Sequence, residues 1–156
     1  MPRPRGADWL EDEVRALKRD GVDVLVSALE ADEVAELELL QEEEFCRAVG
    51  IEFLSFPIPD RSLPGSVERF EAFIDSADRH LRTGKAVVVH CRAGIGRSTM
   101  IAASLLLRHG FSAAESFALL EKARGFPVPD TPEQREWVER FAERGQRNRG
   151  NAAEAE

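Results

Sequence analysis

The sequence predicts a single α/β domain in which a central, mostly parallel sheet is flanked by helices on both faces. Short apolar segments rich in β-branched residues alternate with longer segments whose apolar residues recur every three or four positions, which is typical of alternating strands and helices. A length of 156 residues fits one domain that buries a core without disulfide bonds or a metal ion. We therefore expect one domain over residues 1–156, with its core at about 9–147 and flexible segments at 1–6 and 148–156.

The composition narrows the functional classes. The chain has two cysteines, Cys46 and Cys91, too few for a disulfide framework, and no N-terminal apolar stretch resembles a signal peptide. The most apolar segment, Met100–Leu107, is shorter than the roughly 20 residues that span a bilayer. The net charge of −8 argues against general affinity for nucleic acid. These features predict a cytoplasmic monomer without membrane or nucleic-acid partners, in which any anion site is a local exception.

The first elements are predicted from apolar spacing. Residues 9–21 favour a helix that ends at Gly21, and residues 22–29 read as a buried strand. The helix presents three apolar residues on one face: Leu10, Val14 and Leu17. The acidic span Glu30–Glu44 favours a second helix whose glutamates form a solvated face. Its inward residues would be Val34, Leu37 and Leu40.

Further along, residues 51–58 alternate like a second strand, and a long helix is predicted over Ser66–Arg82. The run AVVV at 86–89 is continuously apolar, which favours a central strand covered on both faces. The segment Ser98–Arg108 is so apolar that it predicts the central buried helix. Capping boxes open the last two helices, at Ser112 with Glu115 and at Thr131 with Gln134.

The composition of the chain changes at His90, where the apolar run AVVV is followed by the segment HCRAGIGRST, which is rich in glycine and arginine. A strand that leads through a glycine-bearing turn into a helix N-terminus builds an anion cradle, because backbone N–H groups and the helix dipole converge on one point. Gly94 and Gly96 supply the backbone freedom that such a turn needs. A nucleotide-binding loop is excluded because its lysine is missing, and a dinucleotide fingerprint is excluded because Thr99 stands where its third glycine belongs. In such a cradle the positive field favours the thiolate of Cys91 over the thiol.

The segment HCRAGIGRS at His90–Ser98 resembles the signature H-C-x-x-G-x-G-R-[ST] of the cysteine-dependent protein tyrosine and dual-specificity phosphatases, and every fixed position matches. The similarity extends to DVLVSAL as a core strand, to FPIPDRSLP as a general-acid loop and to TPEQREWVERF as a C-terminal helix. It covers roughly Trp9–Phe141 and is closest to the small, atypical dual-specificity type. The resemblance implies a phosphate-binding loop between strand and helix.

The resemblance also implies a mechanism. Cys91 would attack phosphorus and form a cysteinyl-phosphate, and the planar fork of Arg97 would hold two phosphoryl oxygens. Ser98 would donate a hydrogen bond to the departing sulfur, and His90 would support the loop. The remaining phosphate contacts would come from the loop backbone, without a metal ion or cofactor: Arg92, Ala93, Gly94, Ile95, Gly96 and Arg97. Cys46 is interpreted as a small buried hydrophobe, with a role as resolving thiol for Cys91 as the alternative.

Two aspartates compete for the role of general acid. Asp60 and Asp130 end similar segments, FPIPD and FPVPD. Asp60 is favoured because it lies in a loop between a strand and a helix, whereas Asp130 is explained by the helix that starts beside it. Gln134 could position the hydrolytic water, and its place in a capping box explains it equally well.

The expected substrate is a phosphorylated protein or peptide, mainly on tyrosine and also on serine or threonine. The apolar Ile95 offers no second cation of the kind expected in an inositol phosphatase. A phosphoinositide or small-metabolite phosphatase is the alternative, and a vestigial phosphate-binding module is a second alternative. A rhodanese-type sulfur-transfer enzyme would leave the Asp60 loop unexplained.

Overall fold

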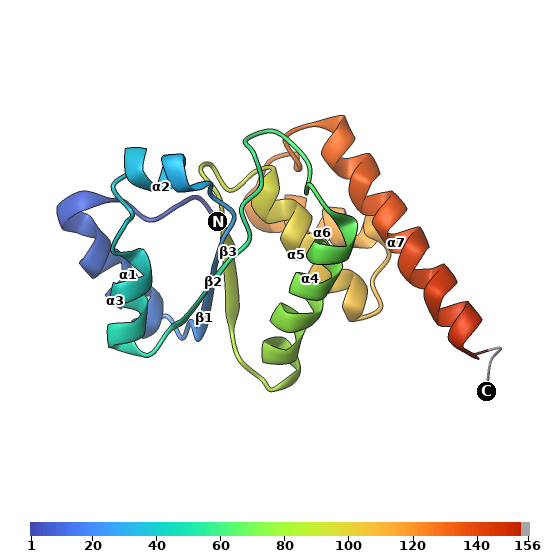
Figure 1. The fold of residues 1–156 in the computed structure, drawn as a ribbon, viewed down its shortest axis with the longest axis horizontal. Coiled ribbons are helices and arrows are strands. Elements are labelled where there is room, and N and C mark those ends of the chain that lie inside the picture. Colours follow the sequence, from blue (N-terminus) through green and yellow to red (C-terminus); the bar gives the residue numbers. More distant parts are fainter. Residues whose placement is uncertain (154–156) are drawn as a thin grey trace.

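The computed structural model describes the backbone of residues 1–153 and the side chains of residues 1–147. Its centre is a parallel sheet of three strands, β1 (Val24–Ser27), β2 (Glu52–Ser55) and β3 (Val87–His90), in the order β2-β1-β3. Helices cover both faces of this sheet (Figure 1). The predicted single α/β domain is therefore confirmed, and the carboxyl ends of all three strands meet at one edge.

The central strand is β1, not the AVVV segment. All four residues of β1 are buried, whereas Val87 and Val88 of β3 are only half-buried because β3 lies at the edge of the sheet. The expectation of a central strand at 86–89 was wrong because a continuous apolar run indicates burial on two faces and says nothing about the number of neighbouring strands.

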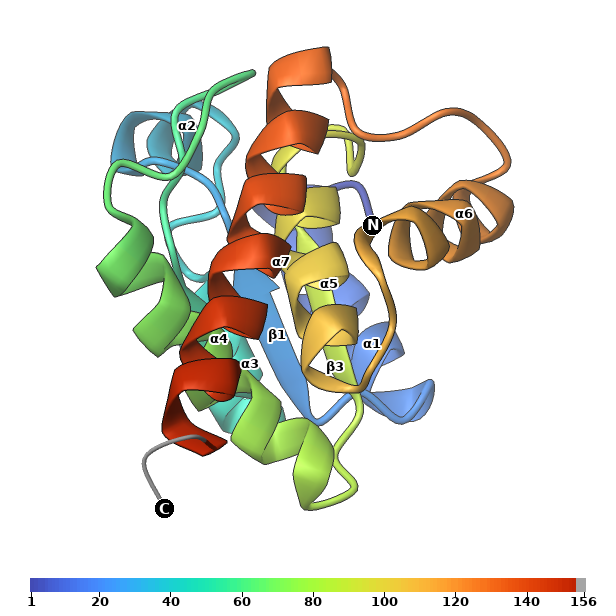
Figure 2. The same cartoon turned by 90° about the vertical axis from the view of Figure 1, so that its right-hand side faces the viewer.

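Two apolar clusters lie on the two faces of the sheet. Leu25 of β1 packs against α1 (Leu10–Arg19) and α3 (Glu42–Val49). Val24 and Val26 face the opposite cluster, which includes residues of four helices. These helices are α4 (Val67–Arg82), α5 (Arg97–Arg108), α6 (Ala113–Arg124) and α7 (Pro132–Ala153). Figure 2 shows α5 and α7 in front of the sheet, with α4 and α6 at their sides, which confirms α5 as the central buried helix.

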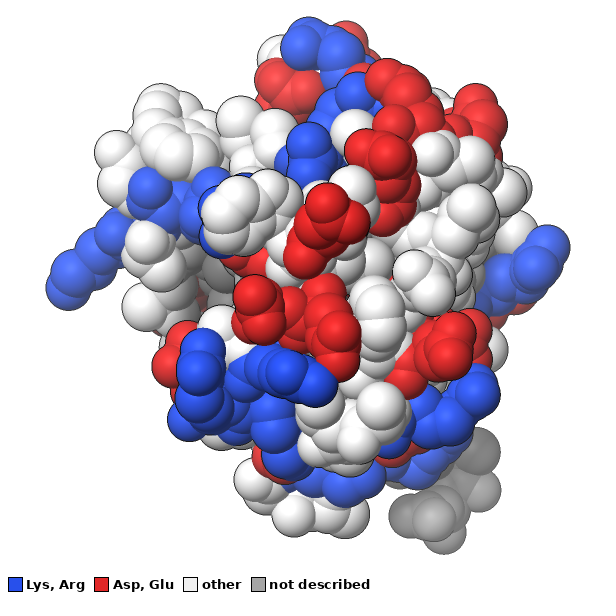
Figure 3. Space-filling model, turned by 90° about the vertical axis from the view of Figure 1, so that its left-hand side faces the viewer, with Lys and Arg blue, Asp and Glu red and all other residues white. Residues whose placement is uncertain are grey.

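The acidic span does not form one helix. It forms α2 (Ala31–Glu36) and α3, separated by a turn in which Glu38 has a positive φ of 56°. This turn changes the faces that the residues present, so Leu40 is 74% exposed and Leu39 is buried. Two glutamates that were expected on a solvated face, Glu33 and Glu42, are also buried. A short 3₁₀ turn at Ala7–Trp9 precedes α1. On the face formed by α1, α2 and α3, acidic and basic side chains are interspersed (Figure 3).

The first residues of the chain contact the sheet, and the last described ones continue α7. The segment 1–6 was expected to be flexible, but the amino group of Met1 donates to the carbonyl oxygen of Val89 at 2.7 Å and Pro2 forms a parallel bridge with Cys91. The free edge of β3 explains these contacts, because it offers unpaired backbone groups. At the other end, α7 continues to Ala153, and residues 154–156 of the segment expected to be flexible lie outside the described residues.

Aromatic side chains pack together in the apolar cluster between the sheet and helices α4, α5, α6 and α7. The ring of Phe70 on α4 makes edge contacts with Phe56, Trp137 and Phe141, with centroid distances of 5.4, 4.8 and 5.3 Å. Edge-to-face packing of this kind adds about 0.5–1.5 kcal/mol per pair beyond burial. In the described part of the chain, no helix has the length and apolar character to cross a membrane.

Candidate active site

Cys91 lies directly after β3, and α5 begins at Arg97, so residues 91–97 form a tight loop between strand and helix, here called the cysteine loop. Gly94 has a φ of 71°, which a side chain rarely adopts. A Cβ atom at Gly96 would lie 2.7 Å from the Gln134 side-chain oxygen. The backbone conformation therefore favours glycine at position 94, and a side chain at position 96 would displace the Gln134 side chain.

The sulfur of Cys91 is surrounded by hydrogen-bond donors. The side chain is almost fully buried, and its Sγ lies 3.3 Å from Oγ of Ser98. Burial opposes ionisation, but the Ser98 hydroxyl and the backbone N–H groups of Ser98, Gly94 and Ile95 outweigh it and lower the pKa of Cys91. The donors of the cysteine loop therefore converge on the sulfur and favour its thiolate form.

Arg97 is buried and held by acceptors from two other segments. It donates to both carboxylate oxygens of Glu33, at 2.6 and 2.9 Å, and to the carboxylate of Asp60 at 2.9 Å. It also donates to the carbonyl oxygen of Ile58 at 3.0 Å. These contacts fix the plane of the guanidinium at the start of α5, where a phosphate would meet the helix N-terminus.

Glu33 belongs to the site through its contact with Arg97, although the sequence did not predict it as a site residue. Burial opposes ionisation of its carboxyl group, but hydrogen bonds from Arg97, from the backbone N–H of Glu30 and from Arg92 lower its pKa to about 2. The sequence offers one weak signal, since Glu33 lies at the third position of α2 and completes a capping box with Glu30. Nothing local distinguishes it from the exposed glutamates around it.

The cavity above the sulfur has a volume of about 270 Å³ and contains both candidate acids. Asp60 reaches it from the loop after β2, and Asp130 from the turn before α7. Arg61 links the two segments, with its Nη1 at 3.3 Å from the Asp130 carboxylate. The two copies of P-x-P-D in the sequence therefore meet at one cavity, which sequence reasoning alone did not anticipate.

Gln134 lines the same cavity and also closes the predicted capping box. Its side-chain oxygen accepts from the N–H of Thr131, and its own N–H donates to Oγ1 of Thr131 at 3.2 Å. Its side-chain amide donates to the carbonyl oxygen of Ser62. The contacts of the capping box fix the Gln134 side chain at the wall of the cavity. A role as helix cap and a role in positioning water are therefore compatible.

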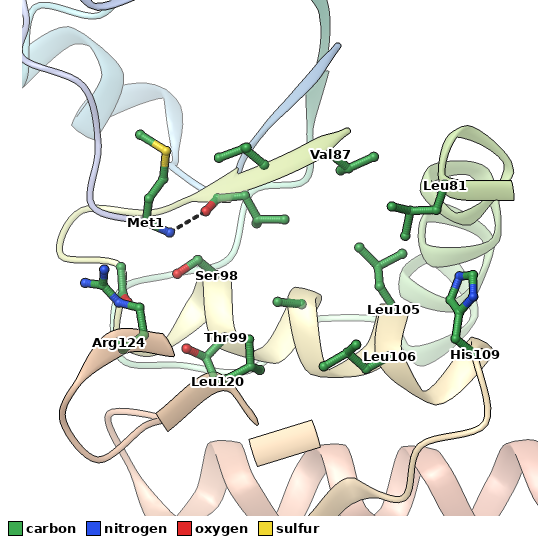
Figure 4. Close-up of a pocket in the computed structure, with 14 residues that line it drawn as sticks. Met1, Leu81, Val87, Ser98, Thr99, Leu105, Leu106, His109, Leu120 and Arg124 are labelled. Atoms are coloured by element: carbon green, nitrogen blue, oxygen red, sulfur yellow. Dashed lines mark hydrogen bonds between the residues drawn. The ribbon is translucent and has the colours of Figure 1, made fainter. Parts of the chain in front are cut away.

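A second cavity, of about 340 Å³, lies behind the cysteine loop (Figure 4). Its walls are mainly aliphatic side chains of β3, α4, α5 and α6, among them Leu81, Leu105 and Leu106. Met1 and Arg124 lie at the end nearest the loop, where Arg124 donates to the carbonyl oxygen of Gly94 at 3.0 Å. This cavity is larger, but Cys91 and Arg97 line the smaller one, which is therefore the candidate active site. Within the described residues, no group of three or more His, Cys, Asp or Glu side chains is arranged to hold a metal ion.

Comparisons with known proteins agree on the class. A sequence model of the family Tc-R-P, described as "Polymorphic toxin system, DSP-PTPase phosphatase", matches residues 1–111. The chain belongs to this family, and with it to the dual-specificity phosphatases of the small, atypical type.

Individual relatives are more distant. The chain is 29% identical to human dual specificity phosphatase 28 over 85 residues, which cover 54% of this chain and 48% of that protein. It is 37% identical to the tyrosine-protein phosphatase CDC14 of Candida albicans over 60 residues, 38% of this chain and 11% of that protein. The matches therefore span about half or less of the length of these curated relatives.

Solved structures share the fold over most of both chains. Tk-PTP in its active form superposes with a TM-score of 0.74 and 30% identity, covering 92% of this chain and 88% of that one. Kinase associated phosphatase has a TM-score of 0.83 at 19% identity, with coverage of 92% and 84%. PTPMT1, solved in complex with PI(5)P, has a TM-score of 0.72 at 24% identity, with coverage of 85% of each chain. The last two similarities establish the fold alone.

Proposed function

We propose that the protein hydrolyses phosphate monoesters on tyrosine, and also on serine and threonine, of phosphorylated proteins. The observation that carries this proposal is the convergence of the Cys91 sulfur, the Arg97 guanidinium and the Asp60 carboxyl group on one cavity. These groups supply a nucleophile, an oxyanion clamp and a proton source, the three requirements for metal-independent transfer of a phosphoryl group.

In the first step, the thiolate of Cys91 attacks phosphorus and the bond from phosphorus to the leaving oxygen breaks. Arg97 holds two phosphoryl oxygens, and protonated Asp60 gives its proton to the leaving oxygen. In the second step, water attacks the cysteinyl-phosphate and passes a proton to the Asp60 carboxylate, and the sulfur–phosphorus bond breaks. The Ser98 hydroxyl, 3.3 Å from the sulfur, donates a hydrogen bond to the departing thiolate. His90 lies behind the loop and supports it.

The pairing of the other arginines at the cavity favours a substrate with one phosphate group. Arg92 pairs with Glu36 at 3.0 Å and with Glu33 at 3.3 Å, and Arg61 pairs with Asp130. A phosphoinositide headgroup with further phosphates would have to compete with these carboxylates. The fold shared with PTPMT1, which was solved with PI(5)P, keeps a phosphoinositide as the second candidate substrate.

The activity is tested with an aryl phosphate in the presence of EDTA. We expect turnover, and we expect Cys91→Ser to abolish it with the fold intact, because a serine hydroxyl is scarcely ionised where a thiolate is needed. Cys46→Ala is the matched control. Burial raises the pKa of Cys46 to about 12, so Cys46 is not expected to act as a nucleophile, and the Cys46→Ala variant should retain phosphatase activity. Activity that depends on a metal ion, or that survives in Cys91→Ser, would rule the mechanism out. Thiosulfate as substrate distinguishes a sulfur-transfer enzyme, and phosphopeptides beside phosphoinositides distinguish the substrate classes.

A further inference from the structure

The aliphatic cavity behind the cysteine loop lies outside the candidate active site and has no part in the proposed mechanism. Its volume of about 340 Å³ is at the lower end of the range of small-molecule pockets, roughly 300–1,000 Å³. Leucine and valine side chains from β3, α4, α5 and α6 supply most of its wall. Such a wall favours an alkyl chain, because the free energy of binding then comes from the burial of apolar surface.

The two ends of this cavity differ in polarity (Figure 4). Arg124 lies at the end next to the cysteine loop, whereas Leu81 and Leu105 lie toward the other end. His109, also toward that other end, is paired with Asp78 at 2.7 Å. Of the residues that line the cavity in the described part of the chain, none is acidic, although the whole sequence has 29 acidic residues. The cavity therefore combines a long aliphatic wall with one cationic end.

The guanidinium of Arg124 keeps a free hydrogen-bond donor at this end. Its Nε donates to the carbonyl oxygen of Gly94 at 3.0 Å, and its Nη2 to that of Ala93 at 3.4 Å. Its Cζ also lies 4.9 Å from the ring centroid of Phe126. Among the described residues, Nη1 has no hydrogen-bond partner, and no carboxylate pairs with this guanidinium. Burial and the charge of Arg124 lower the pKa of the Met1 amino group, as expected beside a cation without a counter-ion.

We propose that this cavity binds a free single-chain amphiphile with an anionic head, of the chemical class of the fatty acids. The carboxylate accepts a hydrogen bond from Nη1 of Arg124, and the alkyl chain lies along α5. From Thr99 to Leu106, α5 extends over about 10 Å at the rise of an α-helix, which suits a chain of medium length. Because Arg124 also holds two carbonyl oxygens of the cysteine loop, the head group lies against the side chain that supports this loop from behind.

Isothermal titration calorimetry at neutral pH tests this site with three probes below their micelle concentrations: decanoate, decanol and hexanoate. We expect decanoate to bind about tenfold or more tighter than decanol, because a hydrogen bond between two charged groups is stronger than one to a hydroxyl group. Decanoate should also bind tighter than hexanoate, by about fourfold for each added methylene. Equal affinity for decanoate and decanol, or no binding of decanoate, would refute the proposal.

Three variants locate the bound molecule. Arg124→Gln should reduce the affinity for decanoate to about that for decanol, and leave the affinity for decanol unchanged. Arg79→Gln is the matched control, because Arg79 is exposed on α4 outside the cavity, and it should keep the preference for decanoate. Ala102→Phe fills the aliphatic part of the cavity and should lower the affinity for both probes. A preference that survived in Arg124→Gln, or full affinity in Ala102→Phe, would place the ligand elsewhere and overturn the proposal.

Near-ultraviolet circular dichroism verifies that each variant is folded. Arg124→Gln removes two hydrogen bonds to the cysteine loop, so if this variant fails to fold, Ala102→Phe and the comparison of the three probes still decide. Calorimetry needs no turnover, and the proposal does not depend on the proposed function. Absence of phosphatase activity would therefore refute that function and leave the amphiphile site standing.

Discussion

Arg97 is the residue on which the largest number of site contacts converge, since its guanidinium reaches α2, the loop after β2 and the cavity. A planar fork can hold one carboxylate with two parallel hydrogen bonds, and it offers the same geometry to two oxygens of a phosphoryl group. The shape of this side chain, as much as its charge, therefore defines the site.

The Arg97→Lys variant keeps the positive charge of the side chain and removes the planar guanidinium group. We expect kcat on an aryl phosphate to fall by about 100-fold or more, because an ammonium group cannot make the bidentate contact that stabilises the transition state. Steady-state kinetics with variation of substrate concentration measure this effect. An increase in KM with unchanged kcat would instead show that Arg97 binds substrate and transition state equally.

Asp60→Asn and Asp130→Asn decide between the two acids of the cavity. General-acid catalysis contributes typically about 10²–10⁴-fold, and its contribution grows with the basicity of the leaving oxygen. We expect Asp60→Asn to lower kcat strongly on phenyl phosphate and much less on nitrophenyl phosphate, and Asp130→Asn to show no such dependence. If the two variants exchanged these behaviours, Asp130 would be the acid.

The residues of the site differ in how visible they are in the sequence. Cys91, Ser98 and Arg97 lie within one short segment, so their spacing alone brings them together in the structure. Glu33 and Glu42 meet the same region only through tertiary packing, and in sequence they belong to a row of glutamates. The spacing of residues in the sequence indicates which side chains share one face of a helix. It does not indicate which other elements of the fold pack against that face.

At the scale of the elements, helix starts were predicted well where side chains specify them. The capping box of Ser112 and Glu115 is present at the start of α6, with the Glu115 N–H donating to Ser112 Oγ at 3.2 Å and the Ser112 N–H to Glu115 Oε2 at 2.8 Å. The break between α2 and α3 was missed, because the left-handed conformation of Glu38 has no signal comparable to a glycine or a proline.

Ser112→Ala tests this cap. We expect the free energy of unfolding to fall by about 0.5–2 kcal/mol, since the first turn of α6 loses an acceptor for its N–H groups. Urea denaturation measures the change. Ser112→Asp is the control, because aspartate also caps helices and should retain most of the stability. Equal stability of Ser112→Ala and the parent protein would show that the cap contributes nothing.

At the scale of the whole molecule, the contact between Glu33 and Arg97 joins the two helical layers at the carboxyl edge of the sheet. The pKa of Glu33 is lowered from 4.5 to about 2 in the folded protein. A carboxyl group with a lowered pKa stabilises the folded state fully at pH above its ordinary value, and this contribution declines as the pH falls toward the lowered one.

Glu33→Gln should therefore destabilise the protein most near neutral pH, and the difference from the parent protein should shrink as the pH falls from 4.5 toward 2. Urea unfolding at a series of pH values measures this difference. Glu36→Gln is the matched control on the same helix, because Glu36 is exposed and its pair with Arg92 contributes little. A difference that stayed constant over this range would contradict the assignment.

The order of the strands has a consequence for the nascent chain. β1 is synthesised first, β2 follows, and β3, its other partner, is the last of the three. Two of the three aromatic rings that contact Phe70 come later still, because Trp137 and Phe141 belong to α7. Sheets that join distant segments fold slowly, and exposed apolar surface promotes aggregation. A growing chain on the ribosome therefore carries an apolar face that stays uncovered until its final helix has emerged, and this face is open to aggregation during that interval.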